Sequence, residues 1–308
     1  MTERIPASAP PAGPSRGLLR LLRSDLFKLW HRPLTWGLIA VSLFFVLAAF
    51  LTLIYTVLNH ASAVLPGHLF GGSVGLGNII IQQLTLGRRV GEFSCVALAG
   101  AAVGVDFSSG ALRVVLGRGV ARWQVLLSKY LALCVFAVFL ALLMTLEAAL
   151  LAGFLPVLVG GAPGLDLLSA GDLGSILRAD LGLLENWVGV MALGVALAIV
   201  GRSAAVGVGG GLAYLIAEDL GGRVLPAITF ETHVAVFREL TSILYSANLN
   251  AFFYHSIPIR LAAELDFLDG VMPTPMVGTA HSLIVAAAFL AALLLISGAL
   301  FARQERGS

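Results

Sequence analysis

The sequence predicts an all-α integral membrane protein with about six transmembrane helices. Hydrophobic residues make up 58% of its 308 residues and charged residues only 12%, and the mean hydropathy is +0.95. Soluble globular domains instead carry about half apolar and about a quarter charged residues. One stretch, from Thr35 to Gly87, contains no Asp, Glu, Lys or Arg. The remaining charges are sorted by sign along the chain, as expected of a protein that crosses the membrane several times.

Apolar runs define the individual spans, each close to the roughly 20 residues that a crossing helix needs. The predicted spans are 34–58, 88–107, 129–153, 182–201, 203–220 and 277–301. In the second span, Glu92 is expected to pair with Arg88 one turn away, while Arg88 and Arg89 reach toward an interface. The fifth span, SAAVGVGGGLAYLIAEDL, is short and rich in glycine, which favours close packing against another helix.

The distribution of charge predicts the orientation of these spans. Lysine and arginine gather in residues 16–32, in residues 113–129 and near the C-terminus, whereas most acidic residues lie between 147 and 269. The positive-inside rule then places both termini in the cytoplasm of a multi-pass cell (plasma) membrane protein. The predicted organisation is a flexible tail (1–17), an interfacial helix (18–33), a single transmembrane domain (34–302), an extracytoplasmic segment with short helices (221–276) and a cytoplasmic tail (303–308).

The basic segment before the first span, RGLLRLLRSDLFKLWHR, has the pattern of an amphipathic helix. Leu18, Leu22, Leu26 and Leu29 share one helical face, and most of the basic residues share the other. Pro33 is expected to end the helix. The pattern predicts a helix that lies on the cytoplasmic surface of the lipid bilayer, near anionic head groups. The residues expected to hold it there are Arg20, Arg23, Lys28 and Trp30.

The sequence does not point to enzymatic chemistry. The only lysines, Lys28 and Lys129, do not follow glycine, so there is no G-x-x-x-x-G-K-[ST] phosphate loop. No HExxH pattern occurs, the serine-rich turn DFSSG lacks the G-x-S-x-G setting of an exposed nucleophile, and the two cysteines have no partner pattern. The chain is therefore expected to be no enzyme and to hold no metal or cofactor, and no nucleic acid partner is expected. A membrane enzyme with a composite site at His233, Glu239 and His255 remains a weaker hypothesis.

Two features favour a different class of transporter. Glu147, in LLMTLEAALLAG, is the carboxylate deepest within a predicted span. Because a charge is costly in the hydrocarbon, Glu147 either marks a transport pathway or reaches the outer interface. The run GVGGG, Gly207 to Gly211, either packs against a helix or forms an unwound substrate site. Together they support the hypothesis of an ion- or proton-coupled secondary carrier that uses Glu147 and the glycine-rich fifth helix.

The segment SSGALRVVLGRGVARWQVLLSKY, residues 108–130, is basic and half apolar. A positive-inside loop between two spans would also be basic. Here, however, Leu112, Val115 and Leu116 form one apolar face, and Gly117 and Gly119 interrupt the pattern. The segment is therefore predicted to form a short amphipathic helix at the cytoplasmic surface, continuous with two spans and able to pass force from a soluble partner to them.

These residues resemble those of a known family, the permease subunits of ATP-binding cassette (ABC) transporters of the type-2 exporter kind. After the second span, such permeases typically carry an acidic residue, Gly-Thr-Leu-Arg, a Leu-rich turn, Arg-Gly-Val-Ser-Arg or Arg-Pro-Val-Ser-Arg, and Leu-Leu-x-Lys. The corresponding residues here are Asp106, Gly110-Ala111-Leu112-Arg113, Val115-Leu116, Arg118-Gly119-Val120-Ala121-Arg122 and Leu126-Leu127-Ser128-Lys129. The departures are Ala111 for threonine, Ala121 for serine and aspartate for the commoner glutamate. The opening LLRSDLFKLWHRPLTW is also similar to that of the family, so the resemblance covers residues 18–153.

The resemblance implies a six-helix half-transporter, a subunit of an exporter, with residues 107–118 as the coupling helix that docks on a cytoplasmic ATPase. ATP and Mg would be bound by that separate ATPase subunit. A second permease chain, identical or related, would complete a homo- or heterodimer. Drugs, peptides, lipids and polysaccharides are all open as cargo. The residues implied in coupling are Asp106, Gly110, Leu112, Arg113, Leu116, Arg118 and Arg122.

Overall fold

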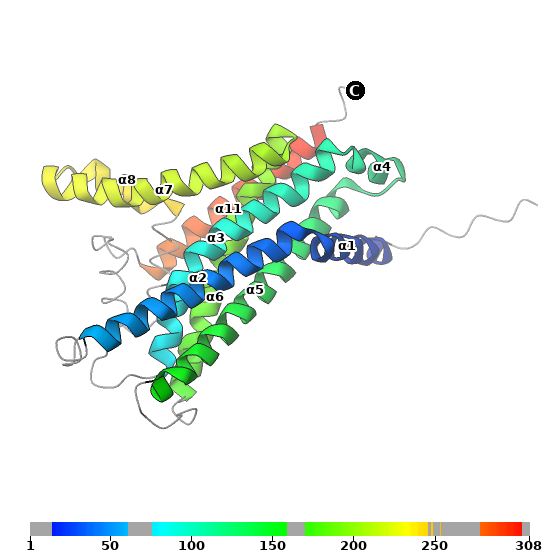
Figure 1. Cartoon of the computed structure of the whole chain (residues 1–308). Coiled ribbons are helices and arrows are strands. Elements are labelled where there is room, and N and C mark those ends of the chain that lie inside the picture. Colours follow the sequence, from blue (N-terminus) through cyan, green and yellow to red (C-terminus); the bar gives the residue numbers. More distant parts are fainter. Residues whose placement is uncertain are drawn as a thin grey trace, which may run out of the picture.

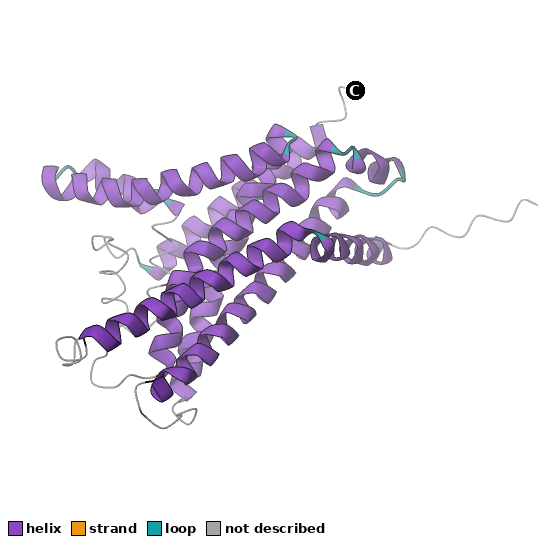
Figure 2. Ribbon diagram, in the orientation of Figure 1, coloured by secondary structure: helices purple, strands orange, loops and turns teal. Residues whose placement is uncertain are grey.

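The computed structural model describes residues 14–60, 76–158, 170–245, 248, 253 and 278–303. Within these residues every regular element is an α-helix (Figure 2). The helices, labelled in Figure 1, are α1 (Pro14–His31), α2 (Pro33–His60), α3 (Leu76–Ser108), α4 (Ala111–Gly117), α5 (Arg122–Leu158), α6 (Ala170–Gly201), α7 (Ala204–Thr232), α8 (Ala235–Ile243) and α11 (Thr279–Arg303). The expected all-α fold is confirmed for this part of the chain.

Five helical stretches among the described residues are long and apolar enough to cross a membrane. They are Pro33–Thr52, Ile79–Ser108, Arg122–Phe154, Leu173–Gly201 and Thr279–Phe301. The chain is therefore a helical membrane protein. The predicted span 203–220 is not among the five, because its glycines and its two acidic residues, Glu218 and Asp219, lower its apolarity.

Several helices extend beyond the predicted spans. α3 begins at Leu76 rather than at 88, α5 at Arg122 rather than at 129, and α6 at Ala170 rather than at 182. For α5 and α6 the prediction stopped at charged residues, which a helix tolerates where protein or water surrounds them, whereas residues 76–87, which lengthen α3, carry no charge. Residues 221–232, expected in the outer segment, continue α7. At the N-terminus α1 includes 14–17 of the expected tail, while residues 1–13 and 304–308 lie outside the described part.

α3 lies at the centre of the bundle, in contact with α2, α5, α6 and α7. Its residues Cys95 to Ala99 are all buried, and the main core is completed by large side chains such as Trp187 and Met144. The outward faces of α2, α5 and α11 are apolar and exposed, for example at Phe44, Leu142 and Leu295. Such faces are expected where lipid surrounds the protein.

α7 packs antiparallel to α3 at glycine positions. An added Cβ at Gly104 would meet the backbone of Ala204, and one at Gly207 would lie 2.8 Å from Cα of Gly100. Further along, an added Cβ at Gly211 would meet the side chain of Val96. The glycine-rich run is thus helical and closely packed, which confirms the packing interpretation and contradicts an unwound site. Over this stretch α7 runs beside a helix that is itself long enough to span the membrane.

α1 ends at His31, and Pro33 begins α2, so the predicted stop is confirmed. The turn between them is fixed by Thr35 Oγ1, which donates to the carbonyl of Leu29 at 2.6 Å. The face that carries Leu22, Leu26 and Leu29 packs into the main core beside α5. α5 therefore covers much of this apolar face.

Candidate functional site

α4 joins α3 to α5 by two tight turns. Gly110, the N-cap, has φ 70°, and Gly119 has φ 77°, a region that glycine enters without steric cost. The predicted apolar face is confirmed: Leu112 is buried in a small cluster with Val125 and Phe301, and Val115 and Leu116 pack against it. α4 therefore packs against the helical bundle through its apolar face.

The opposite face of α4 is open. Arg113, Val114 and Arg118 are exposed, and Trp123 is exposed at the start of α5. Arg122 is half-buried as the first residue of α5. This end of the bundle thus presents basic and apolar side chains together, a composition suited to a protein partner.

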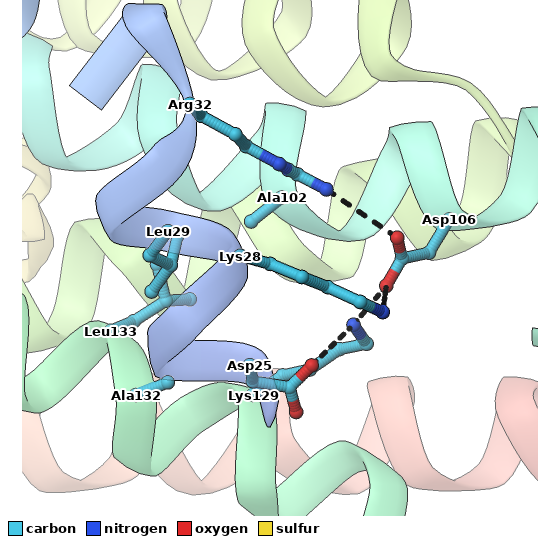
Figure 3. Close-up of a pocket in the computed structure, with 9 residues that line it drawn as sticks. All are labelled: Asp25, Lys28, Leu29, Arg32, Ala102, Asp106, Lys129, Ala132 and Leu133. Carbon is cyan, nitrogen blue, oxygen red and sulfur yellow. Dashed lines mark hydrogen bonds and ion pairs between the residues drawn. The ribbon is translucent and has the colours of Figure 1, made fainter. Parts of the chain in front are cut away.

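Beneath α4, one carboxylate gathers three cations. Asp106, near the end of α3, is only 5% exposed and forms an ion pair with Lys129 of α5. Arg32 Nη2 lies 3.5 Å from its Oδ1, and Lys28 Nζ lies 3.9 Å from its Oδ2. Figure 3 shows all three cationic side chains pointing toward Asp106: Lys28 from α1, Lys129 from α5 and Arg32 from the turn between α1 and α2.

A second carboxylate completes this group. Lys129 Nζ donates to Asp25 Oδ1 at 3.5 Å, and Ser128 Oγ donates to Asp25 Oδ2 at 2.6 Å. We call Asp25, Lys28, Arg32, Asp106, Ser128 and Lys129 the charged junction. It ties α1, α3 and α5 together next to α4, and buried ion pairs of this kind hold only when each charge keeps its partner. Such a group can fasten helices to one another.

Ring and apolar contacts place α11 and α1 at the same end of the bundle. The rings of Phe107 and Phe301 lie 6.0 Å apart, and Leu21 of α1 packs on the cluster that includes Phe301. The start of α1 and the end of α11 therefore lie on the same side as α4.

The predicted coupling residues divide into two sets. Arg113 and Arg118 are on the surface, whereas Asp106, Leu112 and Leu116 face the protein and Gly110 makes the turn. In the N-terminal helix, Arg20 and Arg23 are exposed. Lys28 pairs with Asp106, and Trp30 packs edge-on against Phe139 at 4.7 Å. Two of the four residues expected at the lipid surface therefore hold the helix to the bundle.

Sequence reasoning missed the role of Asp25. A signal was present, because Asp25 is three residues after Leu22 and four before Leu29, and so lies on the apolar face of α1. An acid on such a face indicates a buried cation nearby. Lys129, which lies 104 residues further along the chain, could not be identified as that cation from local pattern alone.

A second polar group lies inside the bundle. Arg88 is 1% exposed; its Nη1 lies 3.4 Å from Glu92 Oε1, which also accepts from Asn186 Nδ2. Trp187 Nε1 donates to the carbonyl of Arg88 at 3.2 Å. The expected pairing with Glu92 is confirmed. The expectation that Arg88 reaches an interface is wrong, because its side chain is buried beside Glu92 in the core.

The residues of the other hypotheses do not form a site. Glu147 is half-buried on α5, with Oε2 enclosed and without a hydrogen bond among the described residues. His233 and Glu239 are exposed at the end of α7 and on α8, and His255 lies outside the described residues. No group of three or more potential metal ligands occurs in the described ranges.

Comparison with known proteins gives no family assignment. No protein-family model matches the chain, and no curated protein is significantly similar to it in sequence. A function must therefore be argued from α4, the charged junction and the resemblance of their sequence.

Proposed function

We propose that this chain is the transmembrane permease subunit of an ABC transporter of the exporter kind. It would couple ATP hydrolysis by a separate cytoplasmic ATPase subunit to substrate movement across the cell membrane. The observation that carries the proposal is α4: a short helix, seated by Leu112 and open at Arg113 and Arg118, between two long helices. A partner that grips this face would move α3 and α5 directly.

The charged junction supports the same function. Force applied to α4 can bend a flexible loop or shift the helices, depending on how firmly α4 is joined to them. Asp106 lies near the end of α3, Lys129 lies near the start of α5, and the two are paired. The ends on both sides of α4 are thus locked together and to α1, so that motion at α4 would reach three helices at once.

The proposed assembly has two permease chains and two ATPase subunits, with ATP and Mg on the latter. In each permease α7 would be the sixth crossing, because residues 204–211 run beside residues 104–96 of α3. The end of the bundle with α1, α4 and the last turn of α11 would face the cytoplasm, in agreement with its arginine and lysine content. Nucleotide binding would then bias the transmembrane states.

The direct test is co-purification in mild detergent with the ATPase encoded next to this chain. An ATPase subunit is expected to come down with the wild type and to be lost from Arg113→Glu/Arg118→Glu, since these exposed residues flank Val114 on the docking face. The control is Arg178→Glu, an exposed arginine on α6 whose Nε donates to its own helix at Gly174. It should leave association intact. Loss of the ATPase subunit from Arg178→Glu as well would contradict the assignment of α4. So would an ATPase subunit that still co-purifies with Arg113→Glu/Arg118→Glu.

The second candidate is an ion- or proton-coupled carrier, favoured only by the enclosed Oε2 of Glu147. A carboxylate in a span is costly and often functional. We expect the chain alone in liposomes not to dissipate a pH gradient, and Glu147→Gln to leave ATPase association unchanged. A proton flux seen with the wild type, lost with Glu147→Gln and kept with the exposed control Glu231→Gln would favour the carrier instead.

A further inference from the structure

Beyond its contact with α3, α7 forms a helical hairpin with α8. α8 packs on α7, and an added Cβ at Gly221 would lie 3.8 Å from Leu244, so α8 returns along the outer half of α7. Figure 1 shows this hairpin projecting sideways from the other helices. We call residues 220–244 the outer arm.

The outer arm carries an apolar stripe that nothing in the described chain covers. Val236, Leu240 and Ile243 of α8 are 62%, 46% and 67% exposed. Their spacing of four and three residues places them on one helical face. The inner face of α8 carries the buried Thr241 and the half-buried Phe237. An amphipathic helix with its apolar side turned away from the protein needs an apolar surrounding.

The depth of the outer arm identifies that surrounding. His281, at the start of the apolar stretch of α11, donates from Nε2 to the carbonyl of Ser242 at 3.2 Å. α8 therefore lies level with the outer end of a membrane-spanning helix. Tyr245, just past α8, stacks on Phe289 at 4.2 Å, and Phe289 is eight residues, or about 12 Å, further into that helix. The base of the arm, where α8 ends, thus lies at bilayer depth.

Two side chains fasten the base of the arm. Asp219 Oδ1 lies 3.1 Å from Arg89 Nη2 of α3, and both side chains are partly exposed, at 31% and 22%. The ring of Tyr245 lies against α6 at Gly189. A Cβ added at Gly189 would overlap that ring, so the glycine leaves space for it. The arm is held at a fixed angle to α3 and α6 rather than tethered loosely.

We propose that the outer arm docks on lipid, with Val236, Leu240 and Ile243 in the outer leaflet at its boundary with the head groups. The tie between Asp219 and Arg89 sets the depth of the stripe. Lipid is favoured over a second copy because the stripe is level with the start of α11 and extends away from the bundle, where acyl chains surround the protein. The proposal requires only that the chain spans the membrane, so it stands or falls separately from the proposed function.

The test uses spin labels on single cysteines in the full chain in nanodiscs, with Cys95 and Cys134 replaced by alanine. Labels at Val236, Leu240 and Ile243 are expected to collide with oxygen, which concentrates in lipid, more than with a water-soluble nickel complex. A label at the exposed Glu231 serves as the reference for an aqueous position. Preferential collision with nickel at all three positions would overturn the proposal. Protection from both reagents would also overturn it, since protein rather than lipid would then cover the stripe.

Asp219→Asn tests the tie without changing the stripe. It removes the charge that pairs with Arg89 at nearly constant shape, so the label at Leu240 should lose its fixed depth and show a broader mixture of accessibilities. Asp219→Glu, which keeps the charge, should restore the original profile. An unchanged profile in Asp219→Asn would show that Arg89 does not set the depth.

Discussion

Replacing Gly100 by alanine is expected to force α3 and α7 apart and to destabilise the protein strongly. An added Cβ at this position would overlap the backbone of Gly207 and Val208, which cannot move aside as a side chain can. Overpacking in a well-packed core costs about 1–3 kcal/mol and occasionally more. Because α6 also approaches here, with an added Cβ at Gly194 lying 3.2 Å from the backbone nitrogen of Gly100, three helices would have to shift.

The control for this prediction is Gly209→Ala, two residues from Gly207 on the same helix. An added Cβ there has no atom within 4 Å, and glycine costs a helix interior up to about 1 kcal/mol relative to alanine. The variant should therefore unfold no earlier than the wild type. The measurement is the midpoint of thermal unfolding in detergent, followed by size exclusion. Equal midpoints for Gly100→Ala and Gly209→Ala would show that α3 and α7 do not depend on close backbone contact.

Features set by local sequence were predictable. Five spans follow from apolar composition, which the sequence displays without knowledge of neighbours. The short helix at 111–117 follows from the periodicity of Leu112, Val115 and Leu116 and from the glycines at its ends. Close packing of the glycine-rich run follows from the lack of side chains.

Features set by distant residues were not predictable. The apolar face of α1 would have the same residue pattern whether lipid or α5 covered it. The sequence pattern therefore could not show that α5 packs on this face. Arg88 was expected at an interface because a buried arginine needs a polar environment. Part of that environment comes from α6, about a hundred residues away, where Asn186 binds Glu92 and Trp187 binds the carbonyl of Arg88. The outer arm extends through Gly221 and Gly222, which ordinarily indicate a break in a helix.

Asp106→Asn is expected to cause the other large loss of stability. It would leave Lys28, Arg32 and Lys129 with Asp25 as the one carboxylate of the charged junction. Lys28 and Arg32 are partly exposed and can turn toward water, but Lys129 is 7% exposed and cannot. Removing one partner of a buried ion pair costs about 3–5 kcal/mol when the other charge is left uncompensated, and the loss here should be smaller because Asp25 still pairs with Lys129. Thermal unfolding of the purified variant should show a clearly lower midpoint.

The double variant Asp106→Asn/Lys129→Met separates charge from packing. It removes both members of the pair, and replacing a buried pair by apolar groups is often neutral, so part of the lost stability should return. The return is not complete, because Asp25 loses its ion pair with Lys129 and keeps the hydrogen bond from Ser128. Failure to recover would mean that Asp106 stabilises the junction mainly through Arg32 and Lys28. A recovered fold that no longer binds the ATPase would be the most informative result, since α4 would then be intact at its surface but no longer joined firmly to α3 and α5.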